Sequence, residues 1–396
     1  MAPVTGSGVP GGGEAVIARR WRGRQTLNHL ACERARLSAA GASVIDLTDT
    51  NPTHHGLGDS RVPAILAQAA ARAGRYDPDP GGPLVAREAL AGRFGGSPED
   101  YWVTSSTSEI YAWLFALLGD PGAVVGVPAP GYPLVEPLAR YANLATAPYP
   151  LHYLHPYGWE YDAARLDDVA ARAVALVAVN PGNPTGAFVG AAARPVVLAA
   201  CARHAVPLIA DEVFFPFTLE SGQPPPDRLA GESSVLTFAL DGVSKLLCAP
   251  GLKLAWLRLS GPAHVVGRVR PVLDEIADTF LPVATVLGLA LPELLAVADD
   301  AVAATRRRLT ANLAQLRALL PETARLRRVD GGWMALVDLP WPDATDPALG
   351  LLRDHHVAVH PGWFYDVADR TCVALSLLPK TAVFHAGVER LAGALG

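Results

Sequence analysis

Short apolar runs alternate with longer segments of helical spacing along most of this chain. Five runs have the length of a β-strand: Val124–Val127, Ala173–Val179, Val206–Ala210, Val235–Ala239 and Leu254–Leu257. Helix-like segments separate them, among them Ser108–Leu118, Ala191–Ala205 and Ala263–Thr279. Strands that are apolar on both faces and alternate with helices indicate a parallel or mostly parallel sheet covered by helices on both sides. The pattern therefore predicts an α/β fold.

The two ends of the chain depart from this alternation. The first 45 residues are rich in arginine after a glycine-containing start, and we expect residues 1–45 to form an N-terminal tail and a surface helix or arm. A long helical pattern at Ala301–Leu320 is followed by a strand-like run at Met334–Leu339 and a final αβ stretch. We therefore predict a large domain at residues 46–290 and a smaller C-terminal α/β domain at residues 291–396.

Charge and composition exclude several classes of function. The net charge of −5 leaves no basic surface for nucleic acid or for an acidic membrane. The longest apolar stretch, Phe280–Leu291, contains Pro282 and is shorter than the roughly 20 residues of a membrane helix. The start of the chain lacks a signal-peptide pattern, and the four cysteines form no CxxC pair. We expect a cytoplasmic protein without a structural metal and without nucleic-acid or membrane partners.

Lysine is scarce in this chain. Of 33 basic side chains only Lys245, Lys253 and Lys380 are lysines, so 33 − 3 = 30 are arginines. A guanidinium cannot be deprotonated to act as a nucleophile, whereas a primary amine can. The three lysines are therefore candidates for chemistry that needs an amine.

Four polar segments follow predicted strands. They are Asn180–Gly186, Asp211–Phe214, Ser244–Lys245 and Ser105–Thr107, the last after a strand at Tyr101–Thr104. Taken singly, such segments are typical of turns and helix caps. Ligands of open parallel sheets nevertheless bind beyond the carboxyl ends of the strands, which is where all four segments are predicted to lie.

With these segments in this order, the chain resembles the class I/II aminotransferases, which are pyridoxal-phosphate enzymes of fold type I. The resemblance runs from about Asp46 to the end, and its most specific parts are the Asn-Pro-Gly-Asn-Pro-Thr-Gly loop and the Ser-Lys segment. Lys253 lies 253 − 245 = 8 residues after Lys245, the spacing of a phosphate-binding arginine in that family. The resemblance implies pyridoxal 5'-phosphate as cofactor, a large domain with a mostly parallel sheet and a smaller C-terminal domain.

The resemblance also implies residue roles that agree with the chemistry of the side chains. Lys245 is the expected Schiff-base lysine and proton shuttle, because the cofactor aldehyde needs an amine. Asp211 is expected to face the pyridine nitrogen, Asn183 to bind the phenolic oxygen and Tyr132 to stack on the ring.

A phosphate dianion favours backbone N–H groups at a helix N-terminus, hydroxyls and a cation. The expected phosphate-binding residues are Ser105, Ser106, Thr107, Ser244 and Lys253. Tyr76 matches a family tyrosine that reaches the phosphate of the neighbouring subunit. That match implies a homodimer with shared active sites.

Three positions depart from the family pattern. Phe214 stands where the family usually has a tyrosine, so a hydrogen-bond donor to the cofactor oxygen is lost and we expect a less acidic cofactor–lysine linkage. Lys253 replaces an arginine and gives up bidentate phosphate binding. Ala374 stands where most members place the arginine that binds the substrate carboxylate.

Either the substrate lacks a carboxylate in the usual place or another cation binds it. Five side chains are candidates for that cation: Lys380, Arg370, His360, His54 and His55. Surface or packing roles are the commoner explanation for the histidines and for Arg370, and we expect Lys380 to be solvated.

The leading hypothesis is therefore an aminotransferase acting on a small amine or amino acid and a keto acid. The alternative is a pyridoxal-phosphate enzyme of another reaction type, such as a lyase, decarboxylase, cyclase or oxidase, because the bond that breaks depends on how the substrate is held. A cofactor-binding regulator is the third hypothesis, which the presence of Lys245 and Asp211 and the lack of a DNA-binding segment disfavour.

Overall fold

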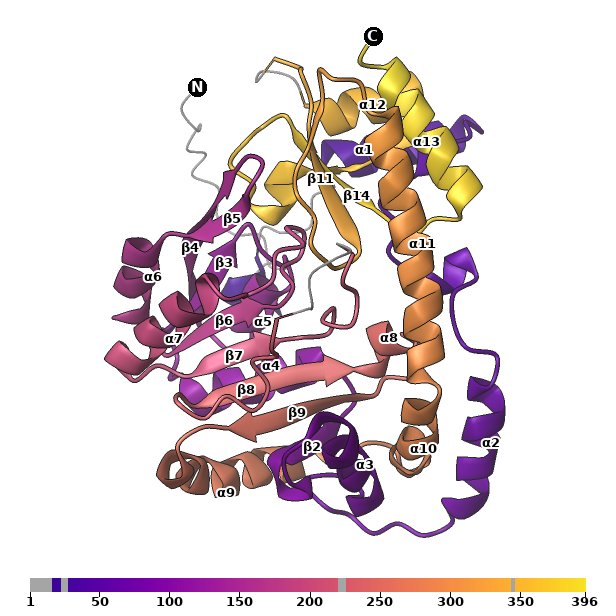
Figure 1. The fold of residues 1–396 in the computed structure, drawn as a ribbon. Helices are drawn as coiled ribbons and strands as arrows, with labels where there is room; N and C mark the ends of the chain where they lie inside the picture. The colour runs from indigo at the N-terminus through magenta and orange to yellow at the C-terminus, as the bar shows by residue number, and fades with distance from the viewer. Residues whose placement is uncertain (1–15, 23–27, 220–225, 343–345) are drawn as a thin grey trace.

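An eight-stranded sheet forms the centre of the larger part of the molecule (Figure 1). The structure is a computed structural model that describes residues 16–22, 28–219, 226–342 and 346–396. In sheet order the strands are β2 (Tyr101–Thr104), β9 (Ala255–Ser260), β8 (Thr237–Gly242), β7 (Leu208–Asp211), β6 (Ala175–Val179), β3 (Val124–Ala129), β4 (Ala145–Leu154) and β5 (Gly158–Tyr161). Strands β8, β7, β6, β3 and β4 are parallel, and the pairs β2–β9, β9–β8 and β4–β5 are antiparallel.

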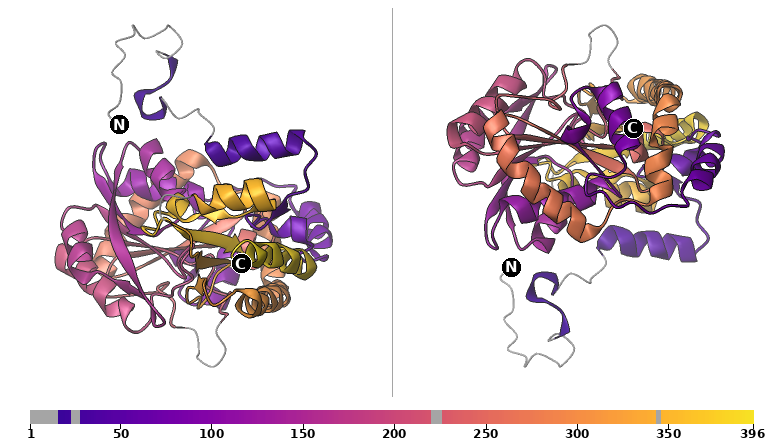
Figure 2. Two further views of the ribbon diagram at one scale, coloured as in Figure 1. Left: turned by 90° about the horizontal axis from the view of Figure 1, so that it is seen from above. Right: turned by 90° about the horizontal axis from the view of Figure 1, so that it is seen from below.

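Helices cover both faces of this sheet, as the apolar pattern predicts (Figure 2). Val177 of β6 faces a core built with α4 (Thr107–Leu118), α5 (Val135–Tyr141) and α9 (Ala263–Phe280). Its neighbours Leu176 and Ala178 point the opposite way, towards α6 (Ala163–Ala170) and α7 (Ala193–His204). The alternation of side chains along a strand explains why these runs are apolar throughout.

A third group of helices lies at the β2 end of the sheet. Helices α2 (Val62–Arg72), α3 (Leu84–Phe94) and α10 (Thr285–Ala296) pack together there with buried side chains of β2 and β9. Among the described residues, no single helix is long and apolar enough to cross a bilayer. Helices α9 and α10 reach that length and apolar composition only when they are taken together, and their axes are bent by 118° at the break between them.

The C-terminal part has its own antiparallel sheet, in the order β10 (Arg325–Leu326), β11 (Met334–Asp338), β14 (Cys372–Ser376) and β13 (His360–Pro361). One face packs on the long helix α11 (Ala298–Leu319), α12 (Pro347–His355) and α13 (Thr381–Gly393). Strand β1 (Ile45–Asp46) pairs with β12 (Val357–Ala358), and α1 (His29–Ala39) packs against α12. We propose that the two larger sheets mark the predicted domains, 46–290 and 291–396.

The predicted tail at residues 1–15 lies outside the described residues. Of the predicted N-terminal arm, a 3-10 turn at Arg19–Trp21 lies against α5 through the Arg140 guanidinium, 5.8 Å from the Trp21 ring, and α1 forms the helix. No apolar run predicts the β4–β5 hairpin, whose first strand, β4, contains Pro148 and Pro150.

Candidate active site

A cavity of about 520 Å³ lies where the carboxyl ends of the central strands face the C-terminal sheet. Eight of the residues predicted from the sequence line it: Ser106, Thr107, Tyr132, Asn183, Asp211, Ser244, Lys245 and Lys253. They come from the loops that follow β2, β3, β6, β7 and β8, which end at the same edge of the sheet. A volume of several hundred Å³ suits a cofactor with a small substrate.

Asp211 is the last residue of β7 and is buried. Its Oδ2 accepts a hydrogen bond from the Tyr111 hydroxyl at 3.1 Å, and its Oδ1 accepts one from the backbone N–H of Val213 at 3.3 Å. Burial raises the pKa of Asp211 to about 6, because the apolar surroundings disfavour the charged form and these two hydrogen bonds only partly oppose that effect. The site therefore holds a carboxylate that a positively charged partner would stabilise.

Lys245 projects from α8 (Val243–Leu246), a single turn that directly follows β8. Its Nζ lies 5.0 Å from the centre of the Trp333 ring and 5.5 Å from that of Phe214. Burial lowers the pKa of Lys245, although the negative charge of Asp211 opposes that shift. A lowered pKa increases the fraction of uncharged amine, which is the nucleophilic form.

The loop after β6 holds Asn183 in the cavity wall. Asn180 anchors this loop: its Nδ2 donates to the buried Glu212 at 2.9 Å, and its Oδ1 accepts from the backbone N–H of Val189 at 2.9 Å. Gly186 ends the loop at φ 67°, and a Cβ there would lie 2.7 Å from the carbonyl oxygen of Gly331. The Oδ1 of Asn183 is buried without a protein partner in the part of the chain that the structure describes, so this acceptor is available to a donor on a ligand.

The N-terminus of α4 forms one end of the cavity. Ser106 caps this helix by accepting a hydrogen bond from the backbone N–H of Glu109 at 3.1 Å. Thr107 and Ser108 follow in its first turn, and Ser244 and Lys253 line the same cavity. Hydroxyls, a lysine and a helix N-terminus together suit a phosphate group.

Two predicted residues do not line the cavity of this single chain. Ser105 is exposed, and both its backbone N–H, at 2.8 Å, and its hydroxyl donate to the carboxylate of Glu109. Tyr76 lies on the extended segment between α2 and α3 and is 63% exposed. An exposed position agrees with a role towards a second copy of the chain, but it contributes nothing to the cavity of its own chain.

Aromatic residues from the C-terminal part complete the cavity, and most of them carry no motif in the sequence. Trp333 packs edge-on against Phe214 at a centroid distance of 5.4 Å, and Phe364 and Tyr365 lie on a short 3-10 turn. Gly332, at φ 81°, precedes Trp333, so the Gly-Gly-Trp segment was the available sequence signal. Tyr111 gave no signal, because its partner Asp211 is 100 residues away in the chain.

Of the five candidate cations for a substrate carboxylate, only His360 lines the cavity. His54 and His55 bind Asp49 outside it, the former with its Nδ1 2.7 Å from Oδ2. Arg370 and Lys380 are exposed. Ala374 is buried in β14 and does not reach the cavity.

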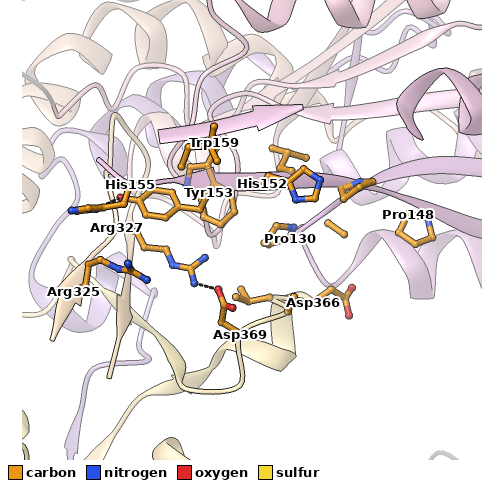
Figure 3. A pocket seen from close by; sticks show the side chains of 16 residues that line it. Pro130, Pro148, His152, Tyr153, His155, Trp159, Arg325, Arg327, Asp366 and Asp369 are labelled. Carbon is orange, nitrogen blue, oxygen red and sulfur yellow. Dashed lines mark hydrogen bonds and ion pairs between the residues drawn. The ribbon is translucent and has the colours of Figure 1, made fainter. Parts of the chain in front are cut away.

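A larger cavity, of about 700 Å³, lies between the β4–β5 hairpin and the C-terminal sheet (Figure 3). Arg327 is buried there between Asp338 and Asp369, and its guanidinium lies 5.2 Å from the centre of the Tyr153 ring. None of the site residues predicted from the sequence lines this cavity. The reactive side chains therefore identify the smaller cavity as the candidate active site.

The chain is similar to several known proteins. The family model described as "Aminotransferase class I and II" matches residues 44–386. An alanine aminotransferase of Mycobacterium tuberculosis is 30% identical over 240 residues, which are 58% of this chain and 54% of that protein. An S-alkyl-thiohydroximate lyase of Arabidopsis thaliana is 29% identical over 206 residues, 51% of this chain and 44% of that protein. The chain thus spans about half the length of these curated relatives.

The fold is shared with solved structures at lower identity. An alanine aminotransferase from Pyrococcus furiosus has a TM-score of 0.83 at 20% identity and covers 96% of this chain and 99% of its own. This likeness confirms the fold predicted from the sequence, a fold type I enzyme with a large mixed sheet flanked by helices. Because the family model matches most of its residues, this chain belongs to the family of class I and II aminotransferases.

Proposed function

We propose that this protein is an aminotransferase acting on a small amine or amino acid and a keto acid or other carbonyl compound. The observation that carries the proposal is the placement of Lys245 and Asp211 in one buried cavity, the amine with a lowered and the carboxyl with a raised pKa. Enzymes of this family depend on pyridoxal phosphate, and each part of that cofactor has a matching group in the cavity.

The residues of the cavity suit the cofactor part by part. The α4 N-terminus with Ser106 and Thr107, together with Ser244 and Lys253, would hold the phosphate. Asp211 would face the pyridine nitrogen, whose positive charge would stabilise the buried carboxylate. Tyr132 would cover the ring, and the side-chain N–H of Asn183 would donate to the phenolic oxygen.

We assign the covalent and proton-transfer chemistry to Lys245. The bound cofactor supplies an aldehyde carbon and a ring that withdraws electrons from the substrate. Lys245 would hold the cofactor through its aldehyde as the Schiff-base lysine, and its amine, once free, would move the proton at the substrate carbon that bears the nitrogen. Over a full cycle, an amine and a carbonyl compound become the corresponding carbonyl compound and amine, so nitrogen, electrons and protons balance.

The second candidate is a reaction that stops short of nitrogen transfer, such as elimination, decarboxylation, cyclisation or oxidation. Two observations favour keeping it. No arginine among the described residues lines the cavity, so this part of the chain supplies no arginine clamp for a carboxylate. One of the relatives reported above is named a lyase.

We also propose a cytoplasmic homodimer in which Tyr76 reaches the phosphate site of the neighbouring subunit. Its exposure supports this role, because a tyrosine that contacts the site of a second copy must project from its own chain.

Borohydride reduction tests the assignment of Lys245. The purified protein should be yellow, and reduction should fix the cofactor on the peptide that contains Lys245, as detected by mass spectrometry. Lys245→Arg should remove both signals, whereas Lys380→Arg, at an exposed helix-capping position outside the cavity, should keep them. A colourless protein without a labelled Lys245 peptide would contradict both reaction types.

A panel of amines separates the two reaction types. Accumulation of the pyridoxamine form of the cofactor would support transamination. Release of carbon dioxide, ammonia or peroxide without accumulation of that form would support the second candidate.

A further inference from the structure

The cavity contains few basic groups that are free to bind an acidic substrate. Among the described residues that line it, the basic side chains are Lys245, Lys253 and His360. The proposed function assigns Lys245 to the cofactor aldehyde and Lys253 to the phosphate. His360 is then the one basic group left for the substrate within this part of the chain.

The surroundings of His360 favour the neutral form of its imidazole. Burial lowers its pKa, and the Asp46 carboxylate and a hydrogen bond with the backbone of Thr48 oppose that shift only in part. Its ring stacks on Phe364 at 5.2 Å with 7° between the planes, and Tyr365 packs edge-on at 5.7 Å. An imidazole that is neutral, with one nitrogen donating to a backbone carbonyl, has an acceptor at the other nitrogen. Such a ring suits a hydrogen-bond donor rather than a carboxylate.

The strand beside His360 adds no charge. Ala374 pairs with His360 across β13–β14 and with Leu336 across β14–β11, so these side chains share one face of the sheet. Ala374 is buried there in an apolar cluster that includes Met334 and Tyr365. Of this cluster, Met334 and Tyr365 line the cavity, and together with Trp333 and Phe214 they give it an aromatic and aliphatic wall.

A carboxylate is costly in such surroundings. Moving an ion from water into a protein interior is strongly unfavourable unless an opposite charge or several hydrogen bonds compensate for the lost hydration. Arginine usually offsets this cost by paired hydrogen bonds to both oxygens, and the described residues offer no such side chain at this wall.

We propose that the substrate is a primary amine with no carboxylate on the carbon that bears the nitrogen. Its apolar side chain packs on the aromatic wall, and a hydrogen-bond donor of the substrate, such as a hydroxyl, faces His360. This inference rests on the proposed function and narrows its substrate class to amines and amino alcohols with an apolar side chain. In a transamination the carbonyl acceptor occupies the same cavity, so we expect an aldehyde or ketone as acceptor rather than a keto acid.

Three cofactor–substrate conjugates test the proposal by binding alone. Phosphopyridoxyl derivatives of phenethylamine, phenylalaninol and phenylalanine differ at one position, which carries hydrogen, a hydroxymethyl group or a carboxylate. Their dissociation constants would be measured by calorimetry on the full chain after removal of cofactor. We expect the hydroxymethyl conjugate to bind most tightly and the carboxylate conjugate to bind at least about tenfold more weakly, equivalent to about 1.4 kcal/mol.

The outcomes separate the substrate class from the function itself. Tightest binding of the carboxylate conjugate would overturn the proposal while leaving the cofactor site intact, and would indicate a cation supplied by a second copy of the chain. If none of the three conjugates bound, the cofactor site and with it the proposed function would be wrong.

A pair of histidine variants tests the acceptor role of His360. His360→Phe keeps an aromatic ring on Phe364 and removes the acceptor, so the preference for hydroxymethyl over hydrogen should disappear while the phenethylamine conjugate still binds. His54→Phe, at an exposed histidine outside the cavity, should keep that preference. An unchanged preference in His360→Phe would show that another group recognises the donor.

Discussion

At the scale of single residues, Asp211 combines two opposing requirements. In the proposed function its carboxylate faces the pyridine nitrogen of the cofactor, yet the folded chain buries that carboxylate and raises its pKa to about 6. A group whose pKa is raised on folding binds its proton more tightly in the folded state, so its contribution to the free energy of unfolding falls as pH rises from about 4 to about 6. The ionised Asp211 carboxylate would therefore be stabilised by the bound cofactor, whereas it lowers the stability of the cofactor-free protein at neutral pH.

Asp211→Asn should stabilise the cofactor-free protein at neutral pH. The variant removes a buried charge, and because Tyr111 can turn its hydroxyl to accept, the hydrogen bonds can persist. The gain in unfolding free energy should approach about 3 kcal/mol at pH 7 and vanish near pH 4. Urea unfolding at both pH values would measure it, with the exposed Asp168→Asn as control. Cofactor affinity should fall in Asp211→Asn, and a pH-independent stability difference would contradict the assignment.

Phe214→Tyr tests the second unusual residue of the cavity. Phe214 lines the cavity beside Lys245, so an added hydroxyl would lie near the cofactor oxygen and stabilise the deprotonated form of the chromophore by donating a hydrogen bond. The pKa read from the absorbance of the bound cofactor should fall by about one unit, corresponding to about 1.4 kcal/mol. Phe215→Tyr, at the next residue and outside the cavity lining, is the matched control. No change in Phe214→Tyr would mean that the hydroxyl points elsewhere.

At the scale of elements, the N-terminus of α4 distinguishes two adjacent serines that the sequence alone does not separate. Ser106 caps the helix and lines the cavity, whereas Ser105 is exposed and bound to Glu109. Ser106→Ala should weaken pyridoxal phosphate binding by about tenfold or more, because it removes a hydrogen bond to a charged group. Ser105→Ala should leave the dissociation constant unchanged.

Pyridoxal without phosphate separates the two roles of Ser106. Loss of the cap costs about 1 kcal/mol of stability whatever the ligand. If Ser106 binds the phosphate, Ser106→Ala should bind unphosphorylated pyridoxal like the unaltered protein. Equal losses for both ligands would show that the serine acts only through the helix.

Elements with a strong periodic pattern were predictable, and irregular ones were not. The strand Tyr101–Thr104 agrees with β2 at both ends, and the predicted helix Ala301–Leu320 corresponds to α11 at Ala298–Leu319. The β4–β5 hairpin escaped prediction because Pro148 and Pro150 interrupt a half-exposed strand that lies near the sheet edge. The cavity residues at strand ends were predictable because parallel strands end together, but the aromatic wall depends on how the C-terminal sheet packs against that edge.

At the scale of the whole molecule, the site described here is that of one chain. Tyr76 lies on an extended, exposed segment and takes no part in the cavity of its own chain. If it completes the site of a second copy, two identical sites are formed across a two-fold axis, and each needs Lys245 from one subunit and Tyr76 from the other.

Hybrid dimers test this arrangement directly. Lys245→Ala and Tyr76→Ala proteins, each of low activity, would be unfolded together and refolded as a mixture. Random pairing makes half of the dimers hybrids, and each hybrid regains one site with both native residues, so activity should rise to about a quarter of that of the unaltered protein. If Tyr76 served its own chain, every Lys245 would remain beside an altered position 76 and mixing would restore nothing. Mixing Lys245→Ala with Asp211→Asn is the matched control, because both residues line the cavity of one chain, so each site of such a hybrid keeps one of the two changes and mixing should restore nothing.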